Sequence, residues 1–332
     1  MRCQQLRRRL HFRCPTCSAE LRPQHEKKLL ACVQGHAVSV AAEGHVHLLP
    51  AGRLPRRATA ASGRGDSDPC IRARRAFFDA GGYSEHRRAV ADEALRALAA
   101  PQPWAGGGEL NLLDAGCGEG AYLRAIEEAS ARAPSSTRPL QLWGTDISKL
   151  AVRLAAKRQR EALFAVAKSS RLPFADGSFD VLLSCFAPID WSEFERVLRL
   201  GGALVVVRGG PEHLMGLKAL MYDESGLRYK AARQPGHERS LGGGLRLERQ
   251  ARVRTEERFE GAAAASLLPM TPFYWKATSA QQREIGAETG GIETVVDFEC
   301  SVYRKREGSE MLKGFTSPRV RPNCSVRIGR GA

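Results

Sequence analysis

The sequence predicts an α/β protein, a doubly wound and mostly parallel sheet preceded by a small N-terminal zinc-binding domain. Short apolar segments alternate with helical ones between residues 111 and 207, and this alternation is typical of βαβ units. Ahead of them, residues 14–36 carry two closely spaced pairs of Cys and His. Hydrophobic residues make up 43% and charged residues 26% of the 332 residues, which is typical of a globular chain with a sizeable core.

The expected elements follow from these patterns in chain order. Residues 72–100 are rich in Ala, Leu and Arg and predict two helices separated by Gly81-Gly82. Residues 223–266 are poorly patterned, with three consecutive glycines and many arginines, and predict an irregular insertion of low order. The remaining expected strands are Asn111–Asp114, Leu140–Asp146, Leu163–Ala167, Phe179–Cys185 and Ala203–Val207, and the remaining helices are Ala121–Ala133, Leu150–Leu163 and Trp191–Leu198.

These patterns divide the chain into four parts. Residues 12–50 form the zinc-binding domain, and residues 51–71, rich in Arg, Ala, Gly, Ser and Pro, form a basic linker. Residues 72–306 form the sheet domain with its insertion, and residues 307–332 form a basic tail that we expect to be disordered.

The net charge of +15 is unevenly distributed. Residues 1–13 hold five arginines and no acid, residues 51–75 hold seven arginines against two aspartates, and residues 303–332 hold eight Lys or Arg against two glutamates. Clustered cations favour a polyanionic partner, because they release counterions from phosphates. Solvated tails, or an organelle-targeting leader at the acid-free N-terminus, explain the same pattern. A bacterial cytoplasm and a plastid or mitochondrion therefore both stay open as locations.

We expect neither membrane insertion nor secretion. No run of eighteen or more apolar residues occurs, and the N-terminus lacks the apolar stretch of a secretory signal. Nine cysteines are too sparse for a disulfide scaffold, and their spacing indicates a metal site or reduced thiols.

Four residues have the spacing of a zinc site. Cys14 and Cys17 lie on one expected turn, and Cys32 and His36 lie on a second, so that two ligands from each turn can close a tetrahedron around Zn²⁺. Four protein ligands leave no open coordination position, which predicts one structural ion. Because a closed zinc site supplies the folding energy of its own module, we expect this domain to fold separately from the sheet.

A glycine-rich loop follows the first expected strand of the sheet. In the segment Asp114-Ala115-Gly116-Cys117-Gly118-Glu119-Gly120, the first glycine allows a tight turn, the second lets the backbone approach a ligand, and the third opens a helix. Asp146 ends the next strand, where a carboxylate can accept hydrogen bonds from ribose hydroxyls. Dinucleotide-dependent oxidoreductases have the same glycine loop and acidic residue, so the loop by itself does not exclude an NAD-dependent enzyme.

A second motif favours another class of enzyme. The segment Leu172–Asp180 reads Leu-Pro-Phe-Ala-Asp-Gly-Ser-Phe-Asp, and Arg199-Leu200-Gly201-Gly202 precedes the last expected strand. Together with the glycine loop, and in this order, these segments resemble the class I S-adenosylmethionine-dependent methyltransferases. The resemblance implies S-adenosylmethionine as the cofactor, and it leaves Phe174 and Phe179 as expected core residues.

Further segments narrow the resemblance. They are Glu43–Pro50, Ala73–Tyr83, Gly210–Leu214 and Met270–Trp275, and they accompany the zinc-binding unit. From about Phe12 to about Arg304 the chain resembles the bacterial 23S rRNA (guanine-N1)-methyltransferases of the RlmA type, in which a zinc finger precedes a class I domain. The resemblance implies methylation of guanine N1 in a hairpin of large-subunit rRNA, a homodimer, and zinc ligation by Cys14, Cys17, Cys32 and His36. It also implies a cofactor pocket lined by Tyr83, Asp114, Gly116, Cys117, Gly118, Glu119, Gly120, Asp146 and His213.

The acceptor side of this reaction has three candidate residues. Because guanine N1 carries a proton and pairs in helices, the base must be unpaired or flipped out before it can be methylated. Phe186 and Trp191, beyond the strand that ends at Cys185, are candidates to stack on the base, and Asp190 is a candidate acceptor of the N1 proton. The family has Tyr at the position of Phe186, so this chain lacks a hydroxyl group there.

Four arginines are expected to hold the RNA. Arg56, Arg57, Arg74 and Arg75 lie between the finger and the sheet and, with the finger, could contact the phosphates of a hairpin from outside the glycine loop. An alternative is an RNA-binding zinc-finger protein whose methyltransferase fold is inactive. The intact glycine loop and Asp146 argue against that alternative.

Overall fold

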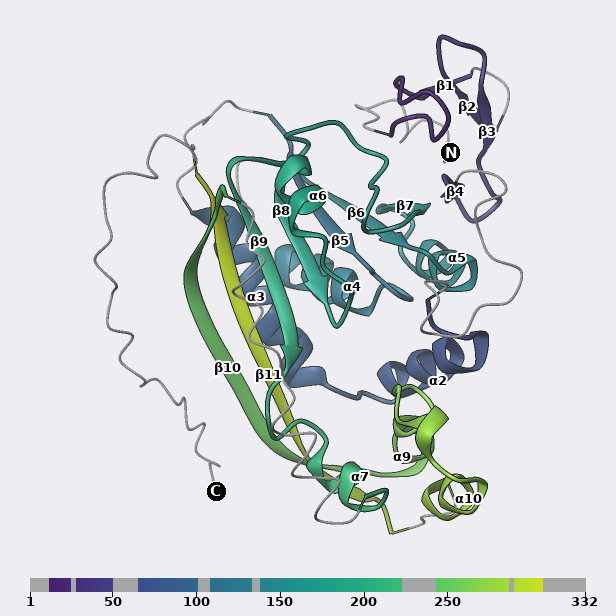
Figure 1. Ribbon diagram of the computed structural model, residues 1–332, viewed down its shortest axis with the longest axis vertical. Helices are drawn as coiled ribbons and strands as arrows, with labels where there is room; N and C mark the ends of the chain where they lie inside the picture. The colour runs from purple at the N-terminus through teal and green to yellow at the C-terminus, as the bar shows by residue number, and fades with distance from the viewer. Residues whose placement is uncertain are drawn as a thin grey trace.

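The computed structural model describes residues 12–24, 28–49, 65–100, 108–132, 138–222, 243–286 and 290–306, and these residues build two sheets (Figure 1). The small N-terminal sheet is antiparallel in the order β1-β2-β3, with strands β1 (Arg22–Pro23), β2 (Leu29–Ala31) and β3 (Ala37–Ser39). The large sheet has the order β10-β11-β9-β8-β5-β6-β7-β4.

The large sheet is doubly wound, as predicted. Its strands are β4 (Val46–His47), β5 (Leu110–Ala115), β6 (Leu140–Asp146), β7 (Leu163–Val166), β8 (Phe179–Cys185), β9 (Leu198–Gly209), β10 (Leu245–Phe259) and β11 (Ile292–Lys305). From β4 to β9 all paired neighbours are parallel, and β11 is antiparallel to both β9 and β10. The chain runs from β5 through β6 to β7 on one side and from β8 to β9 on the other. At such a reversal a crevice opens at the carboxyl ends of the strands, and ligands of doubly wound sheets bind there.

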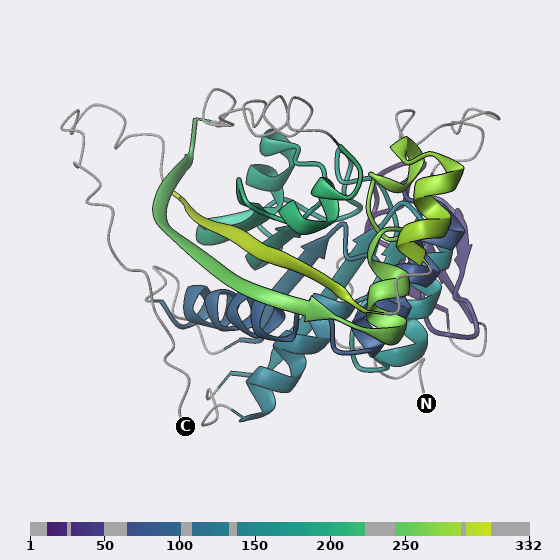
Figure 2. The same cartoon turned by 90° about the horizontal axis from the view of Figure 1, so that it is seen from below.

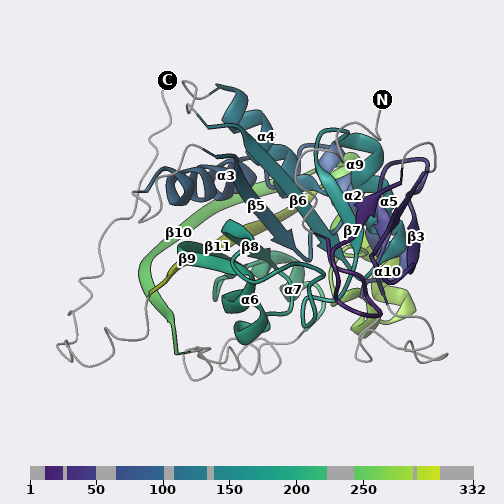
Figure 3. The ribbon, with the colours of Figure 1, turned by 90° about the horizontal axis from the view of Figure 1, so that it is seen from above.

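Helices cover both faces of this sheet (Figure 3). Helices α3 (Ser84–Ala99), α4 (Ala121–Arg132) and α5 (Lys149–Arg158) share one core with the strands, and α6 (Trp191–Val197) contributes to the core of the other face. Side chains of β5 alternate between the two, with Leu112 in the first core and Leu113 in the second. Because both faces are covered, the strands read as nearly continuous apolar runs.

The remaining elements gather beyond the carboxyl ends of the central strands. Helix α2 (Asp68–Asp79) contacts α5 and α9 (Gly261–Leu267), and Figure 2 shows α9 following the long, curved strand β10. The short helices α7 (Met215–Ala219), η3 (Tyr274–Lys276) and α10 (Ser279–Gly286) complete this region. Among the described helices, none combines the length and hydrophobicity that crossing a bilayer requires.

The N-terminal unit is joined to the large sheet. The Phe12 ring stacks on Phe174 at 5.5 Å between centroids and meets the edge of Trp143 at 5.3 Å. The backbone N–H of Arg13 donates to the carbonyl oxygen of Pro173 at 2.7 Å, and β4 pairs with β7 as the edge strand. Strand β4, at the end of the described part of this unit, is therefore a strand of the large sheet. Whether the unit folds separately from the sheet stays a prediction.

The second domain begins earlier than expected. Helix α2 starts at Asp68, inside the stretch 51–71 that was expected to be a linker, because Ser67 caps it and Pro69 lies in its first turn. The Oγ atom of Ser67 accepts the N–H of Cys70 at 3.4 Å. Helix α5 ends at Arg158, before the expected Leu163. Residues 1–11, 51–64 and 307–332, with the expected leader, most of the linker and the tail, lie outside the described residues.

The expected irregular insertion at residues 223–266 is partly wrong, since it contains β10 and most of α9. The strand was missed because eight of its fifteen residues are charged. Its positions nevertheless alternate, with Ala251, Val253 and Thr255 half-buried and their neighbours exposed. Charged side chains of β10 pair with partners on and near β11, for example Arg252 with Asp297 at 2.7 Å. Ion pairs of this kind can stabilise the exposed face of an edge strand whose sequence has no apolar pattern.

We predict that Phe12→Ala destabilises the methyltransferase domain and not only the N-terminal unit. The fully buried ring fills space between Phe174 and Trp143, so its removal should lower the free energy of unfolding by about 3–5 kcal/mol. Chemical denaturation followed by the fluorescence of the buried Trp143 checks this. The control Val33→Ala, at a residue 86% exposed, should leave the transition unchanged. A Trp143 transition that stays at its wild-type midpoint in Phe12→Ala would show that the two units fold independently.

Candidate active site and metal centre

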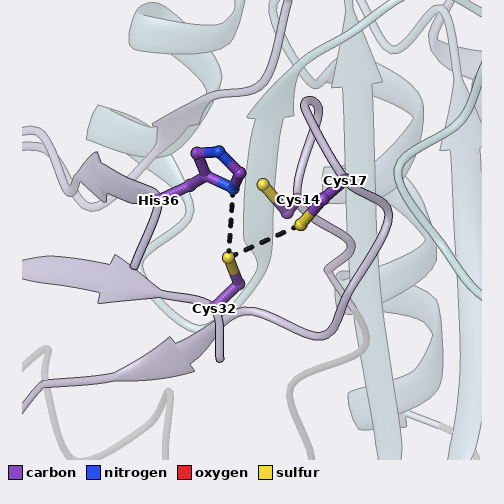
Figure 4. Close-up of side chains that lie close together, drawn as sticks. All are labelled: Cys14, Cys17, Cys32 and His36. Carbon is purple, nitrogen blue, oxygen red and sulfur yellow. Dashed lines mark hydrogen bonds between the residues drawn. The ribbon is translucent and has the colours of Figure 1, made fainter. Parts of the chain in front are cut away.

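The four predicted zinc ligands converge from two turns (Figure 4). Cys14 and Cys17 lie on a turn closed by the N–H of Ser18 donating to the carbonyl of Cys14, and Cys32 and His36 lie on the turn between β2 and β3. The four ligand atoms all lie within 4.8 Å of one another. The Sγ atoms of Cys17 and Cys32 are 3.6 Å apart, and Sγ of Cys32 is 3.4 Å from Nδ1 of His36.

These distances fit a tetrahedral zinc ion. With Zn–S near 2.3 Å, the edge of the tetrahedron between two sulfurs is about 3.8 Å. Three thiolates and one imidazole are a preferred donor set for Zn²⁺, and they fill every coordination position. The site is therefore structural, and the sequence identified all four of its residues.

The glycine loop lies at the strand reversal, between β5 and α4. Gly116 and Gly118 have φ values of +90° and +54°, which L side chains rarely adopt. A Cβ atom on Gly116 would lie 2.4 Å from Cβ of Ala187, so the loop after β8 is seated directly against this glycine. The carboxyl ends of the paired strands β5 and β8 thus bring the glycine loop and the segment after Cys185 together.

Asp146 is fixed beside the same loop. Its Oδ2 accepts the N–H of Gly118 at 2.9 Å and its Oδ1 accepts the N–H of Ser148 at 2.8 Å. Burial raises the pKa of this carboxyl group, and the two backbone donors oppose that shift. Each oxygen retains a lone pair that could accept a further hydrogen bond, for example from a hydroxyl group.

Asp114 is fully buried, and neither of its carboxylate oxygens has a hydrogen-bond partner among the described residues. Burial, and then the negative charge of Asp146, raises the pKa of Asp114 to about 8. An unpartnered carboxylate in the interior is costly unless a cation or a donor approaches it. Asp114, which precedes the glycine loop, therefore holds its proton in the ligand-free protein at neutral pH, and a cationic ligand that approached it would favour the ionised form.

Tyr83 and His213, both expected to line the cofactor pocket, meet in an aromatic cluster. Their ring centroids are 5.8 Å apart, and both rings contact Phe298. Burial, and then Lys218, lowers the pKa of His213 to about 3, so its ring is neutral. Nδ1 of this ring accepts the N–H of Asp297 at 3.3 Å.

Phe186 joins this cluster from the loop after β8. Its ring lies 5.5 Å from that of His213 at an interplanar angle of 31°, and the residue is 47% exposed. Tyr83, Phe186 and Leu214 all have positive φ values, from 52° to 57°. Strained backbone of this kind persists where the surrounding structure holds it, and it concentrates at functional sites. Phe186 thus presents a ring to solvent next to the glycine loop.

The other two acceptor-side candidates have structural contacts instead. Asp190 caps helix α6, with its Oδ1 accepting the N–H of Glu193 at 3.1 Å and the hydroxyl of Ser192 at 2.8 Å. Trp191 is 9% exposed and packs against Tyr303 in the core. Of the three candidates, Phe186 is the one whose ring faces outward beside the loop.

Two residues of the glycine loop point away from open space. The Cys117 side chain is buried, with its sulfur 3.0 Å from where a Cβ on Gly144 would lie. Glu119 is 2% exposed, and its Oε2 accepts Nη1 of Arg75 at 2.6 Å. The Glu119 side chain therefore fastens helix α2 to the loop.

The structure describes two of the four arginines expected to hold the RNA. Arg75 pairs with Glu119 and with Asp79, and Arg74 pairs with Asp66 at 2.6 Å and lies against the glycine loop. Contact of these two arginines with RNA phosphates stays a prediction. Arg56 and Arg57 lie outside the described residues. The sequence did not predict that Arg74 lies beside the glycine loop. Arg74 precedes Tyr83 by nine residues on another helix, and this spacing matches no recognised motif.

We predict one zinc ion per chain. Metal analysis of protein expressed with zinc should give about one equivalent, and Cys17→Ser should lose it because three remaining ligands cannot close the tetrahedron. Since Phe12 and Leu30 pack into the core of the large sheet, the same variant should also lower the melting temperature of that sheet. Thr16→Ala, an exposed change in the same turn, should retain the metal. Less than half an equivalent in the wild type would contradict the assignment.

We also predict a pH dependence that Asp114 creates. Between its ordinary pKa of 3.8 and its folded value of about 8, the folded state holds a proton that the unfolded state has lost. The stability of the ligand-free protein should therefore fall as pH rises from 6 to 8, with a share from Asp114 of up to about 1.4 kcal/mol per pH unit. Denaturation of Asp114→Asn should show a shallower fall, whereas Asp92→Asn, an exposed change on α3, should keep the wild-type slope. Equal slopes in all three proteins would refute this account of Asp114.

Comparisons with known proteins agree with the geometry. Residues 12–53 match the family model described as RlmA, N-terminal, and residues 113–206 match a methyltransferase domain. This match removes the oxidoreductase alternative. A solved structure, the YcgJ protein of Bacillus subtilis, aligns with a TM-score of 0.39 and 16% identity over 68% of this chain and all of its own.

Curated relatives extend the match over most of the chain. The 23S rRNA (guanine(748)-N(1))-methyltransferase of Streptomyces fradiae is 33% identical over 288 residues, which is 86% of this chain and 93% of the relative. A candidate 23S rRNA (guanine-N(1)-)-methyltransferase of Micromonospora griseorubida is 37% identical over 62% of this chain and 68% of the relative. With its zinc ribbon, its glycine loop and this extent of similarity, the chain belongs to the RlmA-type family of 23S rRNA (guanine-N1)-methyltransferases.

Proposed function

We propose that the protein transfers the methyl group of S-adenosylmethionine to N1 of a guanine in 23S-type rRNA. The observation that carries the proposal is the exposed ring of Phe186, held beside the glycine loop by the contact of Ala187 with Gly116, in a chain of this family. A nucleobase needs a flat apolar surface next to the methyl donor, and this is the one the acceptor loop offers. The inactive-fold alternative has no support in the site, where the loop glycines, Asp114 and Asp146 are all in place.

Different residues bind the cofactor and position the guanine. S-adenosylmethionine, when bound, supplies a methyl group that is already activated, so the protein chiefly aligns donor and acceptor. Asp146 would accept hydrogen bonds from ribose hydroxyls, and the buried carboxylate of Asp114 would compensate positive charge on the methionine end. Phe186, braced by the neutral ring of His213, would stack on the guanine after it leaves its helix.

Three finer points belong to the same proposal. The substrate is a hairpin of the large-subunit rRNA, the working form is a homodimer, and the place of action is the bacterial cytoplasm. The family resemblance supports the first two, and the bacterial origin of the relatives supports the third. The docking of the zinc ribbon beside β7 also supports a hairpin substrate, because it places a second binding surface on the same body as the glycine loop.

The proposed activity can be tested on an unmodified 23S rRNA transcript. Incubation with the protein and S-adenosylmethionine should create a reverse-transcriptase stop at one guanine, because N1-methylation blocks base pairing. RNA binding without such a stop would favour the inactive-fold alternative. Methyl incorporation without a stop would place the modification on another atom.

We predict that Phe186→Ala lowers kcat/KM for RNA while the Kd for S-adenosylmethionine stays unchanged. Loss of one stacked base costs about 1–3 kcal/mol, which is roughly a 5- to 150-fold decrease. Phe186→Tyr keeps the ring and should retain most of the activity, since stacking needs only the aromatic face. Equal activity of the Ala variant and the wild type would remove Phe186 from the acceptor site.

A further inference from the structure

The guanidinium of Arg74 enters the edge of the sheet from helix α2, which lies beyond the carboxyl ends of β5 and β6 (Figure 1). Its Nη2 atom makes three contacts with protein atoms. They are Oδ2 of Asp66 at 2.6 Å, the carbonyl oxygen of Met270 at 3.3 Å and Sγ of Cys70 at 3.7 Å. The side chain is 27% exposed, so these contacts hold it in one orientation in a largely buried place.

The other terminal nitrogen faces the glycine loop. Nη1 lies 3.8 Å from where a Cβ atom on Gly118 would be, and no other described heavy atom beyond the neighbouring residues comes within 4 Å of that point. The space above Gly118 is therefore open and bordered by a cation. Because Gly118 also donates its N–H to Asp146, a ligand held by that carboxylate would pass directly beneath Arg74.

Arg74 beside the open space, and Asp114 at the start of the same loop, offer partners for the two charged groups of a zwitterion. Arg74 provides a planar, permanently charged donor, which suits a carboxylate. Asp114, four residues before Gly118 in the chain, is buried, and its carboxyl oxygens have no partner among the described residues, so that a cationic group reaching it would favour its ionised form. An α-amino acid carries both complementary charges on one carbon atom, and S-adenosylmethionine ends in such a group.

We propose that Arg74 is a cofactor-binding residue that holds the α-carboxylate of S-adenosylmethionine, with Asp66 as the positioning residue that keeps Nη1 aimed at the loop. The inference rests on the proposed function and assigns the methionine end of that site. It separates Arg74 from the arginines expected to contact RNA, and it gives a role to a half-buried arginine whose second terminal nitrogen faces the glycine loop.

Decarboxylated S-adenosylmethionine, which lacks only the carboxylate, tests the proposal on the full-length zinc-loaded protein. Calorimetry on the wild type should show tighter binding of S-adenosylmethionine than of the decarboxylated ligand. In Arg74→Met, the Kd for S-adenosylmethionine should rise roughly 10- to 150-fold, the range for a hydrogen bond to a charged group, while the Kd for the decarboxylated ligand stays near its wild-type value. The preference between the two ligands should disappear.

Three further variants make the result specific. Arg72→Met changes an exposed arginine on the same helix and should leave both Kd values unchanged. Asp146→Asn should weaken both ligands by the same factor, since the ribose is common to them. Arg74→Lys keeps a point charge without the planar fork and should retain part of the preference, which also decides the matter if Arg74→Met is too unstable to measure.

The outcomes separate this inference from the function on which it rests. A preference that survives in Arg74→Met or is undiminished in Arg74→Lys would overturn the assignment of Arg74 while leaving the methyltransferase function intact. A wild-type protein that binds both ligands equally would also overturn it. A wild-type protein that binds neither ligand would overturn the proposed function together with the inference.

Discussion

The carboxylate of Glu119 is buried in the glycine loop, and the need to compensate its charge governs how helix α2 packs against this edge of the sheet. Glu119 is met by Arg75 from helix α2 and, at 3.9 Å, by Arg158 at the end of α5. Arg158 also pairs with Asp79, which ties the last turns of the two helices together. Helix α2 is thus held across the crevice by ion pairs as well as by its apolar face.

The position of α2 has consequences further along the chain. Phe77, on its buried face, contacts Tyr83 at 4.7 Å between ring centroids and Phe259 at the end of β10 at 5.1 Å. Tyr83 in turn contacts His213, and His213 contacts Phe186. A continuous set of ring contacts therefore links the helix that covers the glycine loop to the loop that presents Phe186. The helix that covers the glycine loop and the loop that carries Phe186 contact the same aromatic cluster. A substitution on α2 is therefore expected to affect both cofactor binding and the position of Phe186.

The structure also shows which of the many charged side chains form ion pairs with one another. In the described part of residues 51–75, Arg74 pairs with Asp66 and Arg75 pairs with Glu119. On β10, alternate arginines pair across to Glu212, Glu293 and Asp297. Counting charges along the sequence overestimates what is available to a polyanion, since ion pairing between distant segments is decided in three dimensions.

Local patterns in the sequence determined the fold class, most of the parallel strands and the four zinc ligands. Strands β6 and β8 have the predicted limits, because strands buried on both faces are read directly from apolar runs. The zinc ligands were found because each pair lies within one turn, so that spacing fixes geometry. The glycine loop was found for the same reason.

Tertiary structure alone decided which side chains share a site. The charged strand β10 is held by ion pairs with residues more than forty positions away, and no local period records them. Asp190 and Trp191 stand close to Phe186 in sequence, yet one caps helix α6 and the other packs against Tyr303 in the core. Arg74 faces Gly118 only because α2 crosses the carboxyl edge of the sheet. Spacing along the chain predicts contacts within a turn, whereas contacts between segments depend on packing that the whole fold determines.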